Sequence, residues 1–241
     1  MNSVVDGECY KGIVPIENSI EGPVGLTLDL LAHKIDLVIE KEIIIPVSHN
    51  LLICRDSDID GIGDITDVYS HSQALAQCQN YLENHNFKTH FTLSTAAAAK
   101  SIKGQRGVGA IGTLKAAELY GLKPIDKNIQ DIKNNQTRFI ILSKHPSEIT
   151  GNDKTSILFS LSDDNPGGLY KILGLFSRDN INLTKIESRP SKEGLGKYIF
   201  FVDLEGHQDD KKIKKILNLL KEKTSFMKIL GSYPIANIND S

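Results

Sequence analysis

Side chains that can bind an anion or transfer a proton gather in a few short stretches of this 241-residue chain. The first is GIVPIENSIEGPVGLTLDLL, where Glu17, Asn18 and Ser19 stand between a short apolar run and a helix-like apolar pattern. Capping that helix requires only one of them, because a single side-chain oxygen accepts from the exposed N–H groups of the first turn. A carboxylate, an amide and a hydroxyl in succession therefore indicate a binding or catalytic role.

Three further turns place polar side chains between an apolar strand and the helix that follows it. They are Ser70 to Gln73, Ser94 with Thr95, and Thr113. Such turns meet at one edge of an open α/β sheet, where ligands usually bind and where helix N-termini favour anions. For any one turn an ordinary helix cap is the better interpretation. Only their recurrence, with an added amide and a histidine, favours a ligand site.

A third constellation lies in the stretch NNQTRFIIL. Thr137 and Arg138 stand at the start of an apolar strand, where side chains reach the edge of a sheet. An arginine can pair with a carboxylate through two hydrogen bonds, and a threonine hydroxyl can donate to a leaving oxygen. Taken alone, a turn with a surface arginine is the simpler interpretation.

Other chemistries find little support in the sequence. The seven histidines form no HxH or HExxH pattern and no cluster with cysteine, so no metal site is predicted. The run GVGAIG lies within a predicted strand and differs from the GxGxxG of dinucleotide-binding folds. A GxSxG nucleophile motif is absent.

The elements that must position these residues change their order along the chain. Up to the strand TRFIIL, strand and helix patterns alternate, which predicts a layered α/β domain with a largely parallel sheet. A buried strand is expected over 10–16. One helix is expected after DVYSH, with a buried face made of Ala74, Leu75, Cys78 and Leu82.

The order becomes βαββαβ after a polar linker at 145–153, and this order is typical of a ferredoxin-like sandwich. We therefore predict two domains, at 1–147 and 154–233.

The composition of the chain limits which binding partners and which cellular compartment are expected. The chain is 40% apolar and 24% charged with a net charge of −2, so no basic field favours nucleic acid or an anionic membrane. No apolar run reaches the roughly 18 residues of a membrane span, and the N-terminus has no signal-peptide pattern. Cys9, Cys54 and Cys78 form no CxxC pair, which indicates free thiols in a reducing compartment. We expect a cytoplasmic protein with neither nucleic-acid nor membrane partners.

Taken together, the motifs resemble those of one enzyme family. GIVPIENSIEG, YSHSQALAQC, STAAAA, GAIG and NNQTRFIIL occur in this order in prephenate dehydratases, and NPGGLYKIL with ESRP resembles the regulatory ACT domain fused to them. The resemblance covers residues 5–233, and the ordered set is far more specific than any single motif. It implies a two-lobed, periplasmic-binding-protein-like α/β catalytic domain followed by a ferredoxin-like βαββαβ ACT domain.

The family converts prephenate to phenylpyruvate with loss of water and CO2 and uses no cofactor. The resemblance implies a cleft between two lobes, in which Thr137 donates or relays a proton to the leaving hydroxyl. Glu17 is the other candidate acid, with Asn18 beside it, and the choice between Thr137 and Glu17 stays open. Arg138 and the N–H groups near Ser94 would hold carboxylates. The implied substrate-binding residues are Ser19, His71, Gln73, Ser94, Thr95, Arg138 and Phe139.

The ACT resemblance implies feedback inhibition by L-phenylalanine, bound between ACT domains of a homodimer or homotetramer. The implied contacts are Pro166, Gly167, Gly168 and Leu169 on one side and Glu187, Ser188, Arg189 and Pro190 on the facing strand. The family more often has alanine at Gly168, a mild departure that leaves the binding role intact.

A larger departure concerns the beginning of the sequence. Family members have a strand, a loop of the form GPxGTFS and a helix before PIENS, and this chain starts without them. The expectation is a misplaced start or a truncated, weak enzyme with an incomplete first lobe. The alternative function is a catalytically impaired ACT-type amino-acid sensor. A periplasmic-type solute receptor and an RNA-binding domain are disfavoured by the missing signal peptide and the low net charge.

Overall fold

The computed structural model describes residues 1–162 and 165–236, and its contacts divide the chain into two compact units. The larger unit combines residues 1–45 with the chain from 136 onward, and the smaller unit is 46–135. None of the helices in the described residues has the length and apolar character needed to cross a membrane.

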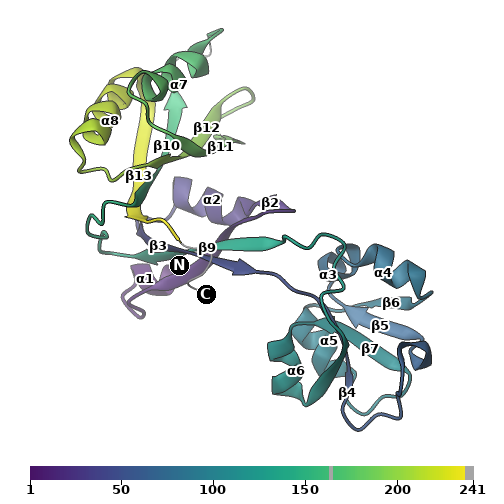
Figure 1. Cartoon of the computed structure of the whole chain (residues 1–241). Helices are drawn as coiled ribbons and strands as arrows, with labels where there is room; N and C mark the ends of the chain where they lie inside the picture. Colours follow the sequence, from purple (N-terminus) through teal and green to yellow (C-terminus); the bar gives the residue numbers. More distant parts are fainter. Residues whose placement is uncertain (163–164, 237–241) are drawn as a thin grey trace. The chain divides into compact units, whose positions relative to one another are not determined.

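Four strands form the first sheet of the larger unit, in the order β2-β1-β9-β3 (Figure 1). This sheet and its helices comprise α1 (Asn2–Val5), β1 (Gly12–Asn18), β2 (Gly22–Pro23), α2 (Gly25–His33), β3 (Val38–Pro46) and β9 (Gln136–Ser143). β1 is antiparallel to both β2 and β9. Leu28 and Leu31 of α2 are buried in the same core as Ile140 of β9, as the helical spacing of the sequence predicts.

The second sheet of the larger unit belongs to a C-terminal domain that spans β10 to β13. Its elements are β10 (Asp153–Leu161), α7 (Gly168–Arg178), β11 (Leu183–Pro190), β12 (Tyr198–Glu205), α8 (Lys211–Lys223) and β13 (Thr224–Pro234). The sheet is antiparallel in the order β11-β12-β10-β13, with α7 and α8 on one face (Figure 1). The predicted βαββαβ order is confirmed. Phe159 and Val202 pack toward Ile172 of α7 and Ile216 of α8.

The other face of this C-terminal sheet packs on the first layer of the same unit. Leu158 and Phe201 of the C-terminal domain share a core with Leu31 and Ile140. The two backbones approach closely at Gly231, where an added Cβ would lie 2.3 Å from the carbonyl oxygen of Ile39. Any side chain at this position would push β13 away from β3, so glycine is required there.

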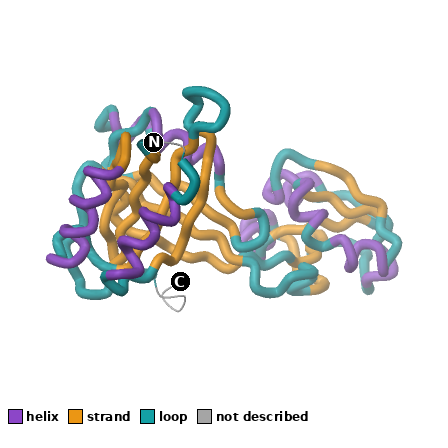
Figure 2. Tube along the Cα trace, turned by 90° about the horizontal axis from the view of Figure 1, so that it is seen from above, coloured by secondary structure: helices purple, strands orange, loops and turns teal. Residues whose placement is uncertain are grey.

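The smaller unit holds a five-stranded sheet in the order β6-β5-β7-β4-β8. Its strands are β4 (Asn50–Cys54), β5 (Asp67–Ser70), β6 (Lys88–Phe91), β7 (Val108–Gly112) and β8 (Leu122–Asp126). Its helices are η1 (Ile62–Asp64), α3 (Ser72–Ala76), α4 (Gln79–Asn84), α5 (Thr95–Ser101) and α6 (Leu114–Tyr120). Figure 2, with helices in purple and strands in orange, shows helices flanking the strands in both units, although α2 shares a core with strands of both sheets of the larger unit.

The prediction of a largely parallel sheet is wrong. β5 is parallel to β6 and β7, but β4 is antiparallel to β7 and β8, and β1 is antiparallel to its neighbours. A parallel pair needs a crossover connection, usually a helix. The chain instead enters the smaller unit directly from β3 into β4 and leaves it from β8 toward β9. Strand β8 was not predicted from the sequence, because its run LKPID contains a proline.

Two local predictions also need correction. The strand expected to be buried over 10–16 is β1, but Tyr10 is 97% exposed and Ile13 56% exposed, because only the face that carries Ile16 packs on the core. The single helix expected after DVYSH is divided into α3 and α4. The Gln77 carbonyl accepts from the N–H of Asp131 at 2.8 Å, a bond to a distant segment at the point where the helix breaks. The residues expected on its inner face are nevertheless buried: Ala74, Leu75, Cys78 and Leu82.

Candidate functional site

Two of the polar motifs of the sequence lie on paired strands. β1 ends with Glu17 and Asn18, and β9 begins with Gln136, Thr137 and Arg138. The register sets Asn18 opposite Thr137 and Glu17 opposite Arg138. Because successive side chains of a strand point to opposite faces, Asn18 and Thr137 lie on one face and Glu17 and Arg138 on the other.

On the first face the asparagine and the threonine are hydrogen-bonded. Asn18 Nδ2 donates to Thr137 Oγ1 at 2.9 Å and to the Gln136 carbonyl at 3.1 Å. Asn18 Oδ1 accepts from the backbone N–H groups of Ile20 and Glu21 at 2.9 and 3.0 Å, which fixes the orientation of the amide. Thr137 is the acceptor of the Asn18 bond, so this bond does not use its hydroxyl hydrogen. The arrangement suits a threonine that donates a proton to a bound group.

Phe139 extends this face, and Ser19 follows Asn18 directly beyond the end of β1. The Ser19 N–H donates to the Gln136 carbonyl at 2.9 Å, and the Ser19 Oγ accepts from the Gln136 N–H at 2.9 Å. Phe139 is half-buried and, two residues after Thr137, shares its face of β9. The structure therefore brings together Asn18, Ser19, Thr137 and Phe139 from the two motifs.

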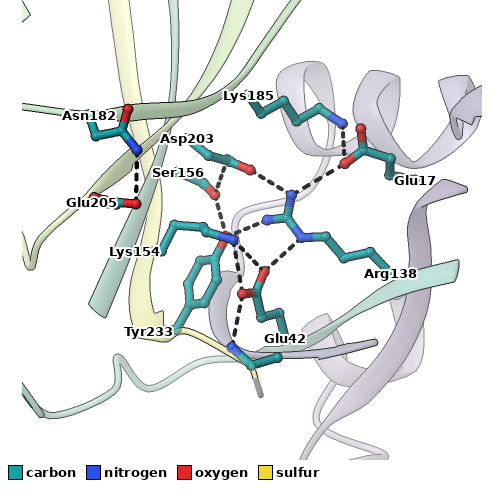
Figure 3. A network of polar contacts seen from close by, with 11 residues as sticks. Glu17, Glu42, Arg138, Lys154, Ser156, Asn182, Lys185, Asp203, Glu205 and Tyr233 are labelled. Carbon is teal, nitrogen blue, oxygen red and sulfur yellow. Dashed lines mark hydrogen bonds and ion pairs between the residues drawn. The ribbon is translucent and has the colours of Figure 1, made fainter. Parts of the chain in front are cut away.

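On the opposite face, Arg138 belongs to a closed ring of polar groups that reaches into the C-terminal domain (Figure 3). Its guanidinium is 2.6 Å from Asp203 Oδ2 on β12 and donates to the Tyr233 hydroxyl on β13 at 2.8 Å. The Ser156 hydroxyl donates to Asp203 Oδ1, so the contact between Ser156 and Tyr233 must use the tyrosine hydrogen. The ring runs from Arg138 through Tyr233 and Ser156 to Asp203 and back to Arg138.

Two further ion pairs attach to this ring. Glu42 on β3 is fully buried and lies 2.7 Å from Arg138 Nε and 2.9 Å from Lys154 Nζ on β10. Glu17 lies 3.4 Å from Arg138 and 2.9 Å from Lys185 Nζ on β11. We call these residues the Arg138 network: Glu17, Glu42, Arg138, Lys154, Ser156, Lys185, Asp203 and Tyr233 (Figure 3). Its cations, Arg138, Lys154 and Lys185, are matched in number by its carboxylates.

Burial and charge act against each other in this network. Burial alone would lower the pKa of the Arg138 guanidinium, but Tyr233, Asp203 and Glu42 outweigh it and hold that pKa above its usual value. Burial raises the pKa of Tyr233, and the charge of Asp203 raises it further, so the phenol stays neutral. Arg138, whose side chain is 11% exposed, is a permanent buried cation held by carboxylates of both domains.

These contacts give Arg138 and Glu17 different partners from those that the sequence suggested. The sequence interpretation assigns Arg138 to a substrate carboxylate, whereas the structure occupies its guanidinium with Glu42, Asp203 and Tyr233. Glu17, the second candidate acid, faces Lys185 on the same side. Strand alternation is the reason, since the residue next to Thr137 and the residue next to Asn18 must both turn away from that pair.

In the smaller unit, the predicted polar turns act as helix caps. The side chains of His71, Ser94 and Thr113 accept from backbone N–H groups at the starts of α3, α5 and α6, at 3.3, 3.0 and 3.1 Å. Because β5, β6 and β7 are parallel, these three turns lie at one edge of the sheet, as expected. Gln73 and Thr95 stand in the first turns that follow.

Two apolar side chains at this edge were not predicted from the sequence. Phe91 is 74% exposed and Leu93 is 96% exposed, and both precede the Ser94 cap. Their signal is the stretch FTLST, in which Phe91 and Leu93 alternate with polar residues between the end of β6 and the start of α5.

The residues predicted to bind phenylalanine lie in two segments of the C-terminal domain. Pro166 and Gly167 are exposed at the start of α7, where Gly167 has a φ of +80°. Gly168 begins the helix, and Leu169 packs against its core.

The segment Glu187, Ser188, Arg189 and Pro190 ends β11, with the serine and proline exposed. Arg189 Nε donates to Asp29 of α2 at 2.9 Å, and Lys192 also contacts this carboxylate. The hydrogen bonds from Lys192 and Arg189 lower the pKa of Asp29.

A pocket of about 300 Å³ lies in the C-terminal domain. Its lining includes residues that flank both segments in the sequence, namely Ser162 before Pro166 and Ser191 after Pro190, together with Tyr198 and Phe200. It offers hydroxyl groups and aromatic rings to a small ligand.

The residues that the C-terminal domain contributes to the Arg138 network were not predicted from the sequence either. Lys154, Lys185 and Asp203 are charged residues within strands that otherwise alternate or are apolar. A charge at an inward-facing strand position is the signal that could have marked them, because such groups are seldom buried without a partner.

Family models match two parts of the chain: prephenate dehydratase over residues 1–147 and the ACT domain over residues 155–220. The second match lies within the C-terminal domain described above.

Known relatives and a solved structure indicate the same family as these two models. A protein named bifunctional chorismate mutase/prephenate dehydratase from Aquifex aeolicus is 46% identical, over 95% of this chain and 62% of that protein. A prephenate dehydratase from Methanocaldococcus jannaschii is 47% identical, over 93% of this chain and 81% of that protein. The chain thus spans less than two thirds of the bifunctional relative. The crystal structure of prephenate dehydratase in complex with L-Phe from Arthrobacter aurescens has a TM-score of 0.86 and 35% identity, over 98% of this chain and 79% of that one. The predicted fold class is confirmed by this likeness.

Proposed function

The chain belongs to the prephenate dehydratase family, and on that premise we propose that it converts prephenate to phenylpyruvate as a carbon–oxygen lyase. The observation that carries the proposal is the 2.9 Å bond from Asn18 to Thr137, which joins the PIENS and TRF motifs on one face of a strand pair. This face presents an oriented amide and a hydroxyl with a hydrogen to donate, as expulsion of a hydroxyl group requires.

The proposed chemistry needs one proton and no outside electrons. The electrons of the bond to the departing CO2 aromatise the ring and expel the ring hydroxyl, which leaves as water once it is protonated. Thr137 donates or relays this proton, its oxygen regains a proton from water, and Asn18 holds the threonine oxygen in place. General-acid assistance of this kind is worth about 10²- to 10⁴-fold in rate.

The remaining assignments are part of the same proposal. Ser19 and Phe139 of the larger unit are assigned to substrate binding, and so, by the resemblance, are His71, Gln73, Ser94 and Thr95 of the smaller unit. The caps leave part of each first helical turn with N–H groups that suit a carboxylate. The resemblance assigns Glu17 to the acid role and Arg138 to carboxylate binding, but their partners Lys185 and Asp203 favour a positioning role for both.

Incubation of the purified chain with prephenate tests the proposal. Phenylpyruvate, followed by its ultraviolet absorbance in alkali, is expected to form in proportion to enzyme concentration, and heat-denatured protein is the control. A folded chain that binds L-phenylalanine without forming phenylpyruvate would instead support the impaired amino-acid sensor.

Regulation by L-phenylalanine is the second part of the proposal. It is supported by the ACT match, by the pocket in the C-terminal domain and by the relative crystallised with L-Phe. The residues assigned are Pro166, Gly167, Gly168, Leu169, Glu187, Ser188, Arg189 and Pro190. We further propose that the chain forms a homodimer or homotetramer, which light scattering with and without L-phenylalanine would measure. We also propose a reducing, cytoplasmic location, which suits the three free cysteines.

The Gly167 turn provides a specific prediction for this regulation. Alanine at φ +80° costs about 1–2 kcal/mol, so Gly167→Ala is expected to displace the start of α7 and to weaken L-phenylalanine binding about tenfold in calorimetry. Gly174→Ala is the matched control, because Gly174 lies inside α7 with open space around its Cα and should leave binding unchanged. Equal binding by both variants would remove the turn from the regulatory site.

A further inference from the structure

The Arg138 network connects the proposed catalytic strand pair to three strands of the C-terminal domain. Lys185 comes from β11, Asp203 from β12 and Tyr233 from β13, and each contacts Glu17 or Arg138. These contacts lie directly behind Asn18 and Thr137, on the opposite face of the same two strands. The face with Asn18 and Thr137 and the face with Glu17 and Arg138 therefore share the backbone of the same two strands.

Lys185 is the most informative member of this network. Its side chain is 9% exposed, and its Nζ lies 2.9 Å from Glu17. The same strand, β11, ends with Glu187, Ser188, Arg189 and Pro190, the segment assigned to L-phenylalanine. A residue of the regulatory sheet thus fixes the carboxylate that immediately precedes Asn18.

We propose that Lys185 and Asp203 are positioning residues for the dehydration, and that they act through Glu17 and Arg138 on Asn18 and Thr137. This inference rests on the proposed function and deepens it. It assigns the proton donor to Thr137 and gives Glu17 no contact with the substrate. Glu17 holds the end of β1 by its pairs with Lys185 and Arg138.

The strand geometry explains how such a residue acts at a distance. Side chains alternate along β1, so a rotation of the strand that moves Glu17 also moves the Asn18 amide. That amide sets the position of the Thr137 oxygen through the 2.9 Å bond. A displacement of about 1 Å at a reacting group can cost about 100-fold in rate. The loss of Lys185 should consequently appear in kcat rather than in KM.

The experiment compares Lys185→Gln with Lys228→Gln in the full chain. Lys228 is also a lysine of the C-terminal domain that reaches the first layer, but it contacts the carbonyls of Ile35 at 2.8 Å and Leu31 at 3.4 Å and the carboxylate of Asp36 at 3.5 Å, and these partners lie outside β1 and β9. Lys185→Gln is expected to lower kcat about 10- to 100-fold with KM almost unchanged, and Lys185→Arg to restore most of the loss. Lys228→Gln should keep the wild-type kcat.

A double-mutant cycle separates positioning from direct catalysis. If Glu17 acts only through its pairs, Glu17→Gln and Lys185→Gln lower kcat to a similar extent and the double variant is little worse than either. If Glu17 is the proton donor, Glu17→Gln alone loses about 10²- to 10⁴-fold and flattens one limb of the pH–rate profile, whereas Lys185→Gln is nearly active. That second pattern would overturn the inference.

A structural readout keeps the inference testable without turnover. The NMR signal of the Asn18 side-chain amide is expected to shift in Lys185→Gln and to stay in place in Lys228→Gln. An unmoved signal in both variants would refute the coupling even in an inactive chain. A wild-type chain that forms no phenylpyruvate counts against the proposed function, whereas an active chain indifferent to Lys185 counts against this inference alone.

Discussion

Replacing Thr137 by alanine is expected to lower kcat about 10²- to 10⁴-fold while KM changes only modestly. The hydroxyl accepts from Asn18 at 2.9 Å. In the proposed mechanism it gives its own hydrogen to the leaving group, so its removal is expected to abolish proton donation. Substrate contacts assigned to other residues remain, which is why binding should survive. Steady-state kinetics of phenylpyruvate formation measures both constants.

Two controls make this result specific. Thr137→Ser keeps a hydroxyl and should retain much of the activity. Thr113→Ala removes another threonine hydroxyl, which caps α6 by accepting an N–H at 3.1 Å, and should cost about 1 kcal/mol of stability without a large loss of kcat. If Thr137→Ala keeps the wild-type kcat, the threonine is not the proton donor and the assignment fails.

The sequence predicted most of the secondary structure because its periodicity was strong. The βαββαβ order, the helix carrying Leu28 and Leu31, and the caps at Ser94 and Thr113 follow from apolar spacing and from residues with known local preferences. The prediction of a largely parallel sheet was wrong because strand direction depends on how the chain passes between the two units. No local sequence pattern encodes that passage.

For the candidate site, the sequence identified the motifs but not their faces. Alternation along a strand requires that Glu17 and Asn18 point apart, yet only the fold shows which face meets the C-terminal domain. Asp203 and Lys185 are far from Arg138 and Glu17 in the sequence, so their contacts arise from tertiary packing alone. A resemblance between motifs predicts which residue types are present but not what they contact. In this chain Arg138 contacts Glu42 and Asp203, whereas the resemblance assigns it to a substrate carboxylate.

Replacing Glu42 by glutamine is expected to destabilise the larger unit by about 3–5 kcal/mol. The Glu42 side chain is fully buried and lies 2.7 Å from Arg138 and 2.9 Å from Lys154. Removing its charge leaves three cations against two carboxylates, and the side chains of Arg138 and Lys154, which lose this partner, are only 11% exposed. For a protein of this size the loss corresponds to a fall of about 6–20 °C in the midpoint of thermal unfolding, measurable by circular dichroism.

Glu40 supplies the matched control on the same strand. Its pair with Lys11 is solvent-accessible, with the lysine side chain 57% exposed, so Glu40→Gln should cost less than about 1 kcal/mol. Removing both partners of the buried pair separates charge from packing. Glu42→Met combined with Lys154→Met leaves two cations and two carboxylates and should recover much of the stability lost in Glu42→Gln, since a balanced replacement leaves no added charge unmatched. If the double variant is less stable than Glu42→Gln, the network is maintained by its hydrogen bonds and shape rather than by its balance of charge.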